Sequence, residues 1–177
     1  MKKLITTAAV CAVLIFSEAV YLDSLKAPEI VDACTVSAAK EKKGMEEYLD
    51  AITAGLIGYD EVDEITKVVI AEAEGESEQG QRYVIDVVLN RVDSKWFPDT
   101  VNDVLYQKNQ FCVSGKRSEA WKNVSDSVYS DIFDMVVEEA DPEKRLNKDI
   151  VFFRTQRYSN YGVPSFKCGA HYFSTYD

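Results

Sequence analysis

The sequence contains a single histidine among its 177 residues. One imidazole, with no cysteines or carboxylates spaced around it as metal ligands, is too little for a zinc site, so no metal or other cofactor is expected. Internal repeats and low-complexity segments are absent, which excludes repeat architectures. Basic residues are in the minority, at 20 Lys and Arg against 30 Asp and Glu, and the formal net charge of −10 argues against nucleic acid as a partner.

Long hydrophobic runs are scarce. The run from Leu4 to Phe16 is uncharged but too short to predict a membrane-spanning helix. Met1-Lys2-Lys3 precede it and Ser17-Glu18-Ala19 follow it, which is the order of charged, apolar and small-residue parts in a secretory signal peptide. We therefore expect cleavage after Ala19 and a protein that is secreted or held in the cell envelope. An uncleaved amino-terminal membrane anchor is the alternative.

Cysteines are few as well. Cys11 lies in the expected signal peptide, which leaves Cys34, Cys112 and Cys168 in the exported protein. In an oxidising compartment a disulfide between Cys112 and Cys168, with Cys34 unpaired, is a reasonable expectation, although sequence alone does not determine the connectivity.

The composition that is present, 46% hydrophobic and 28% charged residues, is typical of one globular domain with appendages. We expect a signal peptide at residues 1–19, a linker with a leading helix at 20–58, and the folded domain at 59–177. The leading helix should cover about 38–57 and be closed by Gly58.

Charge is distributed unevenly along the chain. Residues 60–78 contain eight acidic residues against Lys67 alone, whereas residues 144–173 contain six Lys or Arg residues against Asp149 alone. The basic segment could face an anionic polymer. Solvated surface charge explains the same pattern equally well.

Apolar periodicity predicts a domain that is α+β and mainly helical. Residues spaced on one helix face define helices at about 61–73, 78–92 and 125–140, with a short helix after Thr100. A short connection joins the first two, so we expect them to pack antiparallel. Ile150 to Phe153 should form a short strand. The rest of the carboxyl-terminal part should be irregular until a last element at Gly169 to Phe173.

The residue around which this domain is organised is Glu72. It follows Ile65 by seven residues and Val68 by four, so it lies on the buried face of its helix, near the end that Gly75 would terminate. An Asp60-based N-cap would begin this helix. Removal from water and the negative end of the helix dipole both favour the protonated carboxyl group, which is typical of a general acid. The competing interpretation is a solvated acidic turn, because further glutamates follow.

A series of short motifs follows in a fixed order across about residues 62–174. The motifs are Glu72-Ala73-Glu74-Gly75-Glu76, Gly80-Gln81, Val87-Val88-Leu89-Asn90-Arg91-Val92, Phe97-Pro98, Val101 to Val104, Gln110-Phe111, Phe152-Phe153 and Gly169-Ala170-His171-Tyr172-Phe173. In this order and spacing they resemble the germination-type cell-wall hydrolases, the family of spore cortex-lytic enzymes. Cys112 and Cys168 depart from the resemblance, because they stand where we expect other small residues.

The resemblance implies a lysozyme-like fold with a small irregular or β carboxyl-terminal part. It also implies cleavage of the glycan strand of peptidoglycan between muramic acid and glucosamine, by a lytic transglycosylase. The first glutamate of the EAxGE motif, Glu72 here, is then the catalytic acid, and residues 59–177 are the catalytic domain.

Other motif residues then have roles in a substrate cleft. Tyr172, Phe173 and Phe111 would form an apolar floor on which sugar rings lie, while Gln110 would supply directional hydrogen bonds. Core packing is the competing explanation for these aromatic residues, and it is the one we expect for Phe152-Phe153.

Two more residues are candidates for the site. Glu76 is the nearest second carboxylate to Glu72, but Gly75 interrupts the helix between them, which favours a substrate-binding or structural role. The lone histidine, His171, would orient the cleft by hydrogen bonding. A second catalytic carboxylate is not required, because one glutamate can protonate the glycosidic oxygen and then accept the proton of the muramic C6 hydroxyl as a 1,6-anhydro ring closes.

Other function classes stay open from the residues alone. A cysteine peptidase on the peptide stems would need a thiolate and an imidazole, which Cys112 or Cys168 with His171 would supply. A non-catalytic glycan-binding module is a further alternative. For the favoured function the partners are the glycan strands of peptidoglycan, and the protein is expected to be a monomer without a cofactor.

Overall fold

The computed structural model describes residues 33–176. The predicted signal peptide at residues 1–19 lies outside the described residues. The chain divides into two compact units, Met1–Glu41 and Lys42–Asp177, and helix α2 (Ala33–Thr53) extends across the boundary between them. Its end at Thr53 precedes the predicted end near residue 57. None of the helices within residues 33–176 is both long and apolar enough to cross a membrane.

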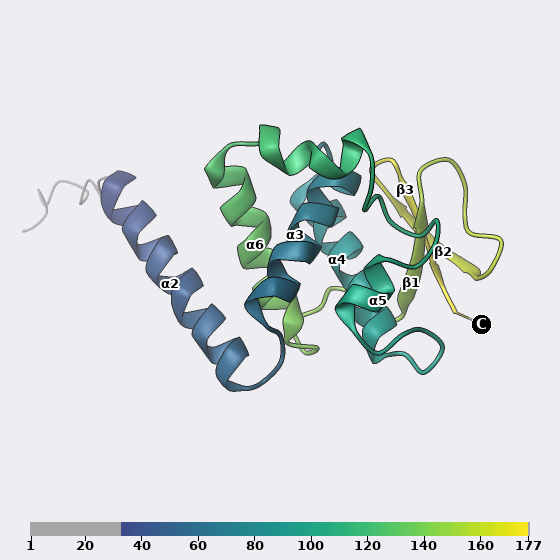
Figure 1. Cartoon of the computed structure of the whole chain (residues 1–177), viewed down its shortest axis with the longest axis horizontal. Helices are drawn as coiled ribbons and strands as arrows, with labels where there is room; N and C mark the ends of the chain where they lie inside the picture. The colour runs from purple at the N-terminus through teal and green to yellow at the C-terminus, as the bar shows by residue number, and fades with distance from the viewer. Residues whose placement is uncertain (1–32, 177) are drawn as a thin grey trace, which may run out of the picture. The chain divides into compact units, whose positions relative to one another are not determined.

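The second unit is α+β, as predicted, with its helices first and its strands last (Figure 1). The helices are α3 (Tyr59–Ala73), α4 (Glu78–Asp93), α5 (Val101–Leu105), the 3-10 helix η1 (Lys116–Asn123) and α6 (Asp126–Ala140). The strands are β1 (Ile150–Arg154), β2 (Val163–Cys168) and β3 (His171–Thr175), which form one antiparallel sheet in the order β1-β3-β2. The predicted helices are confirmed. Helix η1 and strand β2 were not predicted.

Helix α3 is the centre of this unit, because α4, α5, α6 and η1 all pack against it. The helix begins at Tyr59, with Gly58 as its N-cap, and the Gly58 N–H donates a hydrogen bond of 2.8 Å to the Glu61 carboxylate. The predicted cap at Asp60 is therefore wrong. The bond from Gly58 to Glu61 is the backward half of a capping box, and the cap lies two residues before the predicted one.

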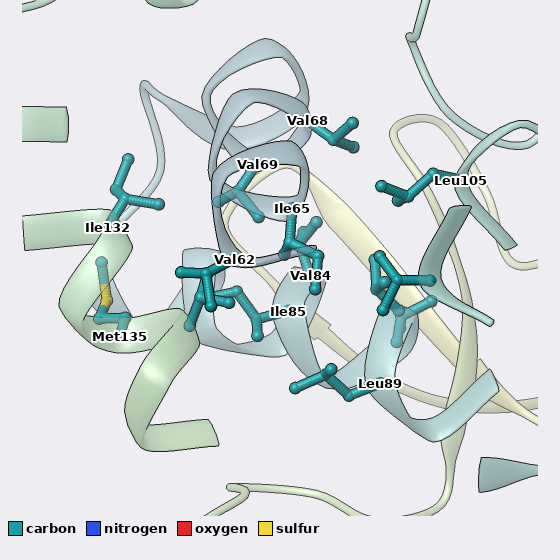
Figure 2. Packing of buried hydrophobic residues seen from close by; sticks show 14 of the residues in the cluster. Val62, Ile65, Val68, Val69, Val84, Ile85, Leu89, Leu105, Ile132 and Met135 are labelled. Carbon is teal, nitrogen blue, oxygen red and sulfur yellow. The ribbon is translucent and has the colours of Figure 1, made fainter. Parts of the chain in front are cut away.

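The hydrophobic core brings α3, α4 and α6 together (Figure 2). Its residues include Val62, Ile65 and Val69 of α3, Val84, Ile85 and Leu89 of α4, Leu105 of α5, and Ile132 and Met135 of α6. Burying each side chain of this size stabilises the fold by about 1.5–3 kcal/mol. This packing therefore holds α3, and with it the last turn of the helix, in place.

The sheet is attached to α4 by the side chains of Asn90 and Arg91, which are both buried. Asn90 Nδ2 donates hydrogen bonds to the carbonyls of Asn147 and Ile150, at 2.8 and 2.9 Å. Arg91 Nε donates to the Val151 carbonyl at 2.7 Å. These bonds satisfy buried backbone acceptors and hold the start of β1 against the helix.

Strand β2 forms where the sequence predicts irregular structure, and its residues are mostly exposed. It contains Pro164, which cannot donate a ladder hydrogen bond and is tolerated at a sheet edge, where β2 lies. The pairing of β2 with β3 is also irregular, between Pro164 and Phe166. An exposed, proline-containing edge strand has little periodic signal, which explains the missed prediction.

Two carboxylates, Asp86 of α4 and Glu139 of α6, are completely buried. Arg82 forms an ion pair of 3.0 Å with Glu139, and the Asn147 N–H donates a hydrogen bond of 2.8 Å to Asp86. Burial raises the pKa of Asp86 to about 8, and the negative charge of Glu139 acts in the same direction. The folded protein therefore holds a proton that the unfolded chain, with an Asp pKa of about 3.9, releases.

This proton makes stability depend on pH. The folded pKa of Asp86 lies above the unfolded one, so its contribution is fully present below about pH 4 and is lost as pH rises through about 8. Asp86→Asn should reduce the loss, because the amide can accept from the Asn147 N–H and donate to Glu139. Urea unfolding at pH 5 and pH 8 should show a smaller decrease of the unfolding free energy in the variant, by up to about 1.4 kcal/mol per pH unit.

The control is Asp149→Asn, which removes an exposed aspartate and should keep the wild-type pH dependence. An equal decrease in wild type and Asp86→Asn would contradict a proton held by the buried pair.

Candidate active site

Glu72 occupies the last turn of α3, which ends at Ala73. Its side chain is only 12% exposed, and it lines a cleft of about 500 Å³. The other lining residues come from α4, from the segment that includes η1, and from β1 and the loop after it: Arg91, Lys108, Asn109, Gln110, Arg117, Phe152, Phe153, Arg154, Thr155, Ser159 and Tyr161. The carboxyl group of Glu72 is thus sheltered by the protein and still open to a molecule in the cleft.

A larger cavity of about 680 Å³ lies beside the carboxyl-terminal end of α4. Its described lining includes Trp96, Arg145 and Tyr176, but none of the predicted site residues. We therefore assign the candidate site to the smaller cleft, which contains the sequence-predicted acid.

Two groups hold the Glu72 carboxylate in place. The backbone N–H of Cys112 donates a hydrogen bond of 2.7 Å to Oε1, and Arg117 Nη2 lies 3.8 Å from Oε2. Arg117 also donates to the carbonyls of Ala71 at 2.6 Å and of Glu72 at 3.3 Å. It thereby satisfies backbone acceptors that the end of a helix leaves open. Arg117 is not among the residues predicted from the sequence, because η1 is a polar segment without apolar periodicity.

Glu76 is held by the turn between β2 and β3. The Ala170 N–H lies 3.3 and 3.2 Å from its two carboxylate oxygens. Gly169 adopts a φ of 54°, and a Cβ at this position would lie 1.7 Å from Glu76 Oε2. The structure thus joins the EAxGE motif to the Gly169-to-Phe173 motif. Glu76 does not line the Glu72 cleft, which favours the structural alternative for this residue.

His171 is buried, with 1% exposure, and its ring packs edge-on against Phe153 at a centroid distance of 5.1 Å. Burial lowers the pKa of His171, while the charges of Glu76 and Glu72 act in the opposite direction. Its Nδ1 has no hydrogen-bond partner within the described residues. The imidazole therefore lies within electrostatic reach of both glutamates, but the hydrogen bond expected to orient the cleft is not formed through Nδ1.

The aromatic residues of the cleft differ from those that the sequence predicts. Phe173 is completely buried and Phe111 is 8% exposed, so both rings serve the core. Tyr172 is partly buried against Tyr158, at a centroid distance of 5.1 Å, and it does not line the cleft. Gln110 is exposed and does line it.

The aromatic lining instead comes from Phe152, Phe153 and Tyr161. The first two were expected in the core. Successive side chains of a regular strand point to opposite faces, and an irregularity alters this order. The register of β1 shifts between Ile150 and Phe152, and the sequence pattern does not predict this shift.

Arg91 lies at the edge of this cleft and is 3% exposed. Its guanidinium lies over the rings of Phe97, Phe111 and Phe152, with centroid distances of 4.9, 5.1 and 5.5 Å. Burial lowers the pKa of Arg91 to about 10. Its Nη1 has no hydrogen-bond partner in the described part of the chain. Buried charges are usually paired, so a guanidinium held among aromatic rings without a carboxylate is an unusual feature of this cleft.

Cys112 and Cys168 are free thiols, so the predicted disulfide between them is wrong. The backbone N–H of Cys112 contacts Glu72, whereas Cys168 is the last residue of β2. Burial raises the pKa of the Cys112 thiol, and the charge of Glu72 raises it further. Within residues 33–176, no three His, Cys, Asp or Glu side chains converge to hold a metal ion.

Comparisons with known proteins bear on this site. A family model described as Cell Wall Hydrolase matches residues 75–174, more than half of the chain. The match includes Glu76 and Gln110 and begins three residues after Glu72. The spore cortex-lytic enzyme of Oceanobacillus iheyensis is 32% identical over 72 residues, which are 41% of this chain and 26% of that relative. The chain thus spans about a quarter of the relative's length. No solved structure matches the chain significantly.

The contact between Gly169 and Glu76 can be tested through stability. Gly169→Ala should destabilise the protein, because a left-handed φ costs a non-glycine residue about 1–2 kcal/mol and the new Cβ would displace the Glu76 carboxylate from the Ala170 N–H. Thermal unfolding should show a lowered Tm. The matched control is Gly75→Ala, because a Cβ there would meet nothing within 4 Å.

A double-mutant cycle separates the two causes. With Glu76→Ala in place, Gly169→Ala should cost less than it does in the wild type, because only the backbone strain remains. Fully additive losses would contradict a direct contact between the two positions.

Proposed function

The chain belongs to the cell wall hydrolase family, and we propose that it cleaves the glycan strands of peptidoglycan between muramic acid and glucosamine, as a lytic transglycosylase. The observation that carries the proposal is the carboxylate content of the cleft. Of the described residues that line it, only Glu72 carries a carboxylate. Glycosidases that use water or a covalent intermediate need a second carboxylate across the scissile bond, whereas a lytic transglycosylase does not.

Glu72 acts twice in this mechanism. As the acid, it gives its proton to the glycosidic oxygen while the bond from the muramic C1 to that oxygen breaks, and glucosamine leaves with a free hydroxyl group. As the resulting carboxylate, it takes the proton of the muramic C6 hydroxyl while the C6 oxygen bonds to C1. The product is a 1,6-anhydro sugar, and Glu72 is protonated again. No water is consumed.

The contacts of Glu72 position its carboxyl group and suit the second step. The Cys112 N–H holds Oε1, which leaves Oε2 directed by Arg117 and open to the substrate. When Glu72 has given up its proton, the N–H and the guanidinium stabilise the carboxylate by hydrogen bonding and charge. Gln110, exposed at the cleft, would bind polar groups of the sugars. Phe152 and Tyr161 offer ring surfaces against which a sugar ring can pack.

The cysteine peptidase is less well supported. Cys168 lies opposite His171 in the β2–β3 ladder, but among the described residues no hydrogen bond joins the thiol of Cys112 or Cys168 to the His171 imidazole. The Cys112 thiol has a raised pKa, whereas a nucleophilic cysteine needs a lowered one. A glycan-binding module without activity is the other alternative, and it predicts binding without products.

Further parts of the proposal rest on the sequence resemblance. We propose a lysozyme-like catalytic domain at residues 59–177, preceded by a linker and leading helix at 20–58. The signal peptide at 1–19 would send a monomeric enzyme to the cell envelope or the exterior, where peptidoglycan lies.

Replacing the proposed acid provides the direct test. Glu72→Gln keeps the shape of the side chain and the hydrogen bond from Cys112 but cannot donate the proton, so activity should fall by about 10²–10⁴-fold or more. The measurement is release of muropeptides from purified peptidoglycan, with mass spectrometry to detect 1,6-anhydro ends. Glu74→Gln, which changes an exposed residue two positions further along the chain, should be close to wild type. Normal turnover by folded Glu72→Gln would sink the proposal.

A second variant distinguishes glycan cleavage from the cysteine peptidase. Cys112→Ala keeps the backbone N–H that contacts Glu72, so glycan cleavage should continue at close to the wild-type rate. Loss of all activity in a folded Cys112→Ala protein, or products cut in the peptide stems, would favour the peptidase instead.

A further inference from the structure

The cleft that contains Glu72 is basic, although the protein is acidic. Four positively charged side chains line it, those of Arg91, Lys108, Arg117 and Arg154, against Glu72 as the one acidic residue of its described lining. The whole chain has a formal net charge of −10. A local reversal of sign on this scale points to an anionic ligand, because clefts concentrate the field of the charges that line them.

Two of these four charges have no acidic partner in the part of the chain that the structure describes. Lys108 and Arg154 are exposed, and no acidic side chain among the described residues forms an ion pair with either of them. Several basic residues elsewhere do form ion pairs. Lys67 pairs with Asp63, Arg82 with Glu139, Arg145 with Asp93, and Lys148 with Glu143. Lys144 and Arg157 are also exposed and form no ion pair among the described residues, but neither lines the cleft. Lys108 and Arg154 are therefore distinguished by their position, as unpaired charges that a molecule in the cleft would meet.

Arg91 supports the same conclusion from inside the protein. Its guanidinium is buried, is surrounded by three aromatic rings and is not paired with a carboxylate in the described residues. A charge in such a poorly solvated position is screened weakly, so it acts over a longer range than a charge on the surface. It adds a fixed positive potential to the cleft that a substrate carboxylate would offset.

We propose that the cleft binds carboxylate groups carried by the glycan strand, and that Lys108 and Arg154 are the residues that recognise them. The proposal rests on the glycan-cleaving function above and names the substrate class of that site. Carboxylates on such strands have two sources: the lactyl group of a muramic acid without a stem, and the peptide stem itself. Either would meet the same basic side chains, whereas a neutral amino-sugar polymer would not.

The test uses two pairs of substrates, and the two members of each pair differ in the charge of their carboxylate groups. Stem-free glycan oligomers, which carry lactyl carboxylates, and stem-bearing oligomers are each used as they are and after conversion of their carboxylates to methylamides. Amidation should raise KM by about tenfold for at least one pair and leave kcat nearly unchanged. A rise for the first pair identifies the lactyl group, and a rise for the second identifies the stem. Equal KM values within both pairs would overturn the proposal.

Variants connect the effect to the two residues. Lys108→Gln and Arg154→Gln should each raise KM for the charged substrate by about threefold, and neither should change KM for the amidated one. Lys144→Gln is the matched control, because it removes the same charge from an exposed residue outside the cleft. The side chains of both cleft residues are exposed and form no hydrogen bond or ion pair among the described residues. The variants should therefore keep the wild-type Tm.

The outcomes separate this inference from the function on which it rests. If the wild type cleaves none of the four substrates, the glycan-cleaving function itself is contradicted. If the wild type cleaves them all, and the cleft variants raise KM for charged and amidated forms alike, the function stands and recognition of carboxylates is rejected.

Discussion

The contact between the Glu76 carboxylate and the Ala170 N–H joins the segment that follows α3 to the β2–β3 turn. Glu76 follows the end of α3, and Ala170 lies in the turn between β2 and β3. The left-handed Gly169 lets the carboxylate approach more closely than any side chain would permit. His171 follows directly and is buried within reach of the charges of Glu72 and Glu76. The Glu76 carboxylate therefore adds a second link between the helices and the sheet, at the β2–β3 turn, to the one that Asn90 and Arg91 make with β1.

The end of α3 has its own requirement, since the last carbonyls of a helix have no partner within it. Arg117 contacts the carbonyls of Ala71 and Glu72, and Gln81 Nε2 donates to the carbonyls of Ala73 and Glu74 at 3.2 and 3.3 Å. Polar side chains from two other segments thus complete the helix where the acid is presented. The Gly80-Gln81 motif has a structural explanation in this contact, and Arg117 combines helix capping with a position beside the acid.

Sequence reasoning succeeded where the signal is local. The period of apolar residues located α3, α4 and α6, and the same spacing placed Glu72 on a sheltered face at a helix end. It failed where the outcome depends on long-range contacts. The register of β1 shifts between Ile150 and Phe152, and Phe152 lines the cleft. Phe173 is covered by the core, and Cys112 and Cys168 are free thiols. Arg117 had no local signal, because its importance lies in carbonyls forty-five residues away.

If an acidic protein is to bind an anionic polymer, as proposed here, the local arrangement of its charges matters more than their sum. At physiological ionic strength the Debye length is about 8 Å, so the distant acids of the surface act weakly on a molecule already at the cleft. Several acidic residues elsewhere form ion pairs, such as Glu139 with Arg82 and Asp63 with Lys67. What a bound strand would meet is the local excess of Lys108 and Arg154, backed by a buried guanidinium. The net charge of the chain therefore predicts its solubility better than the sign of its ligand.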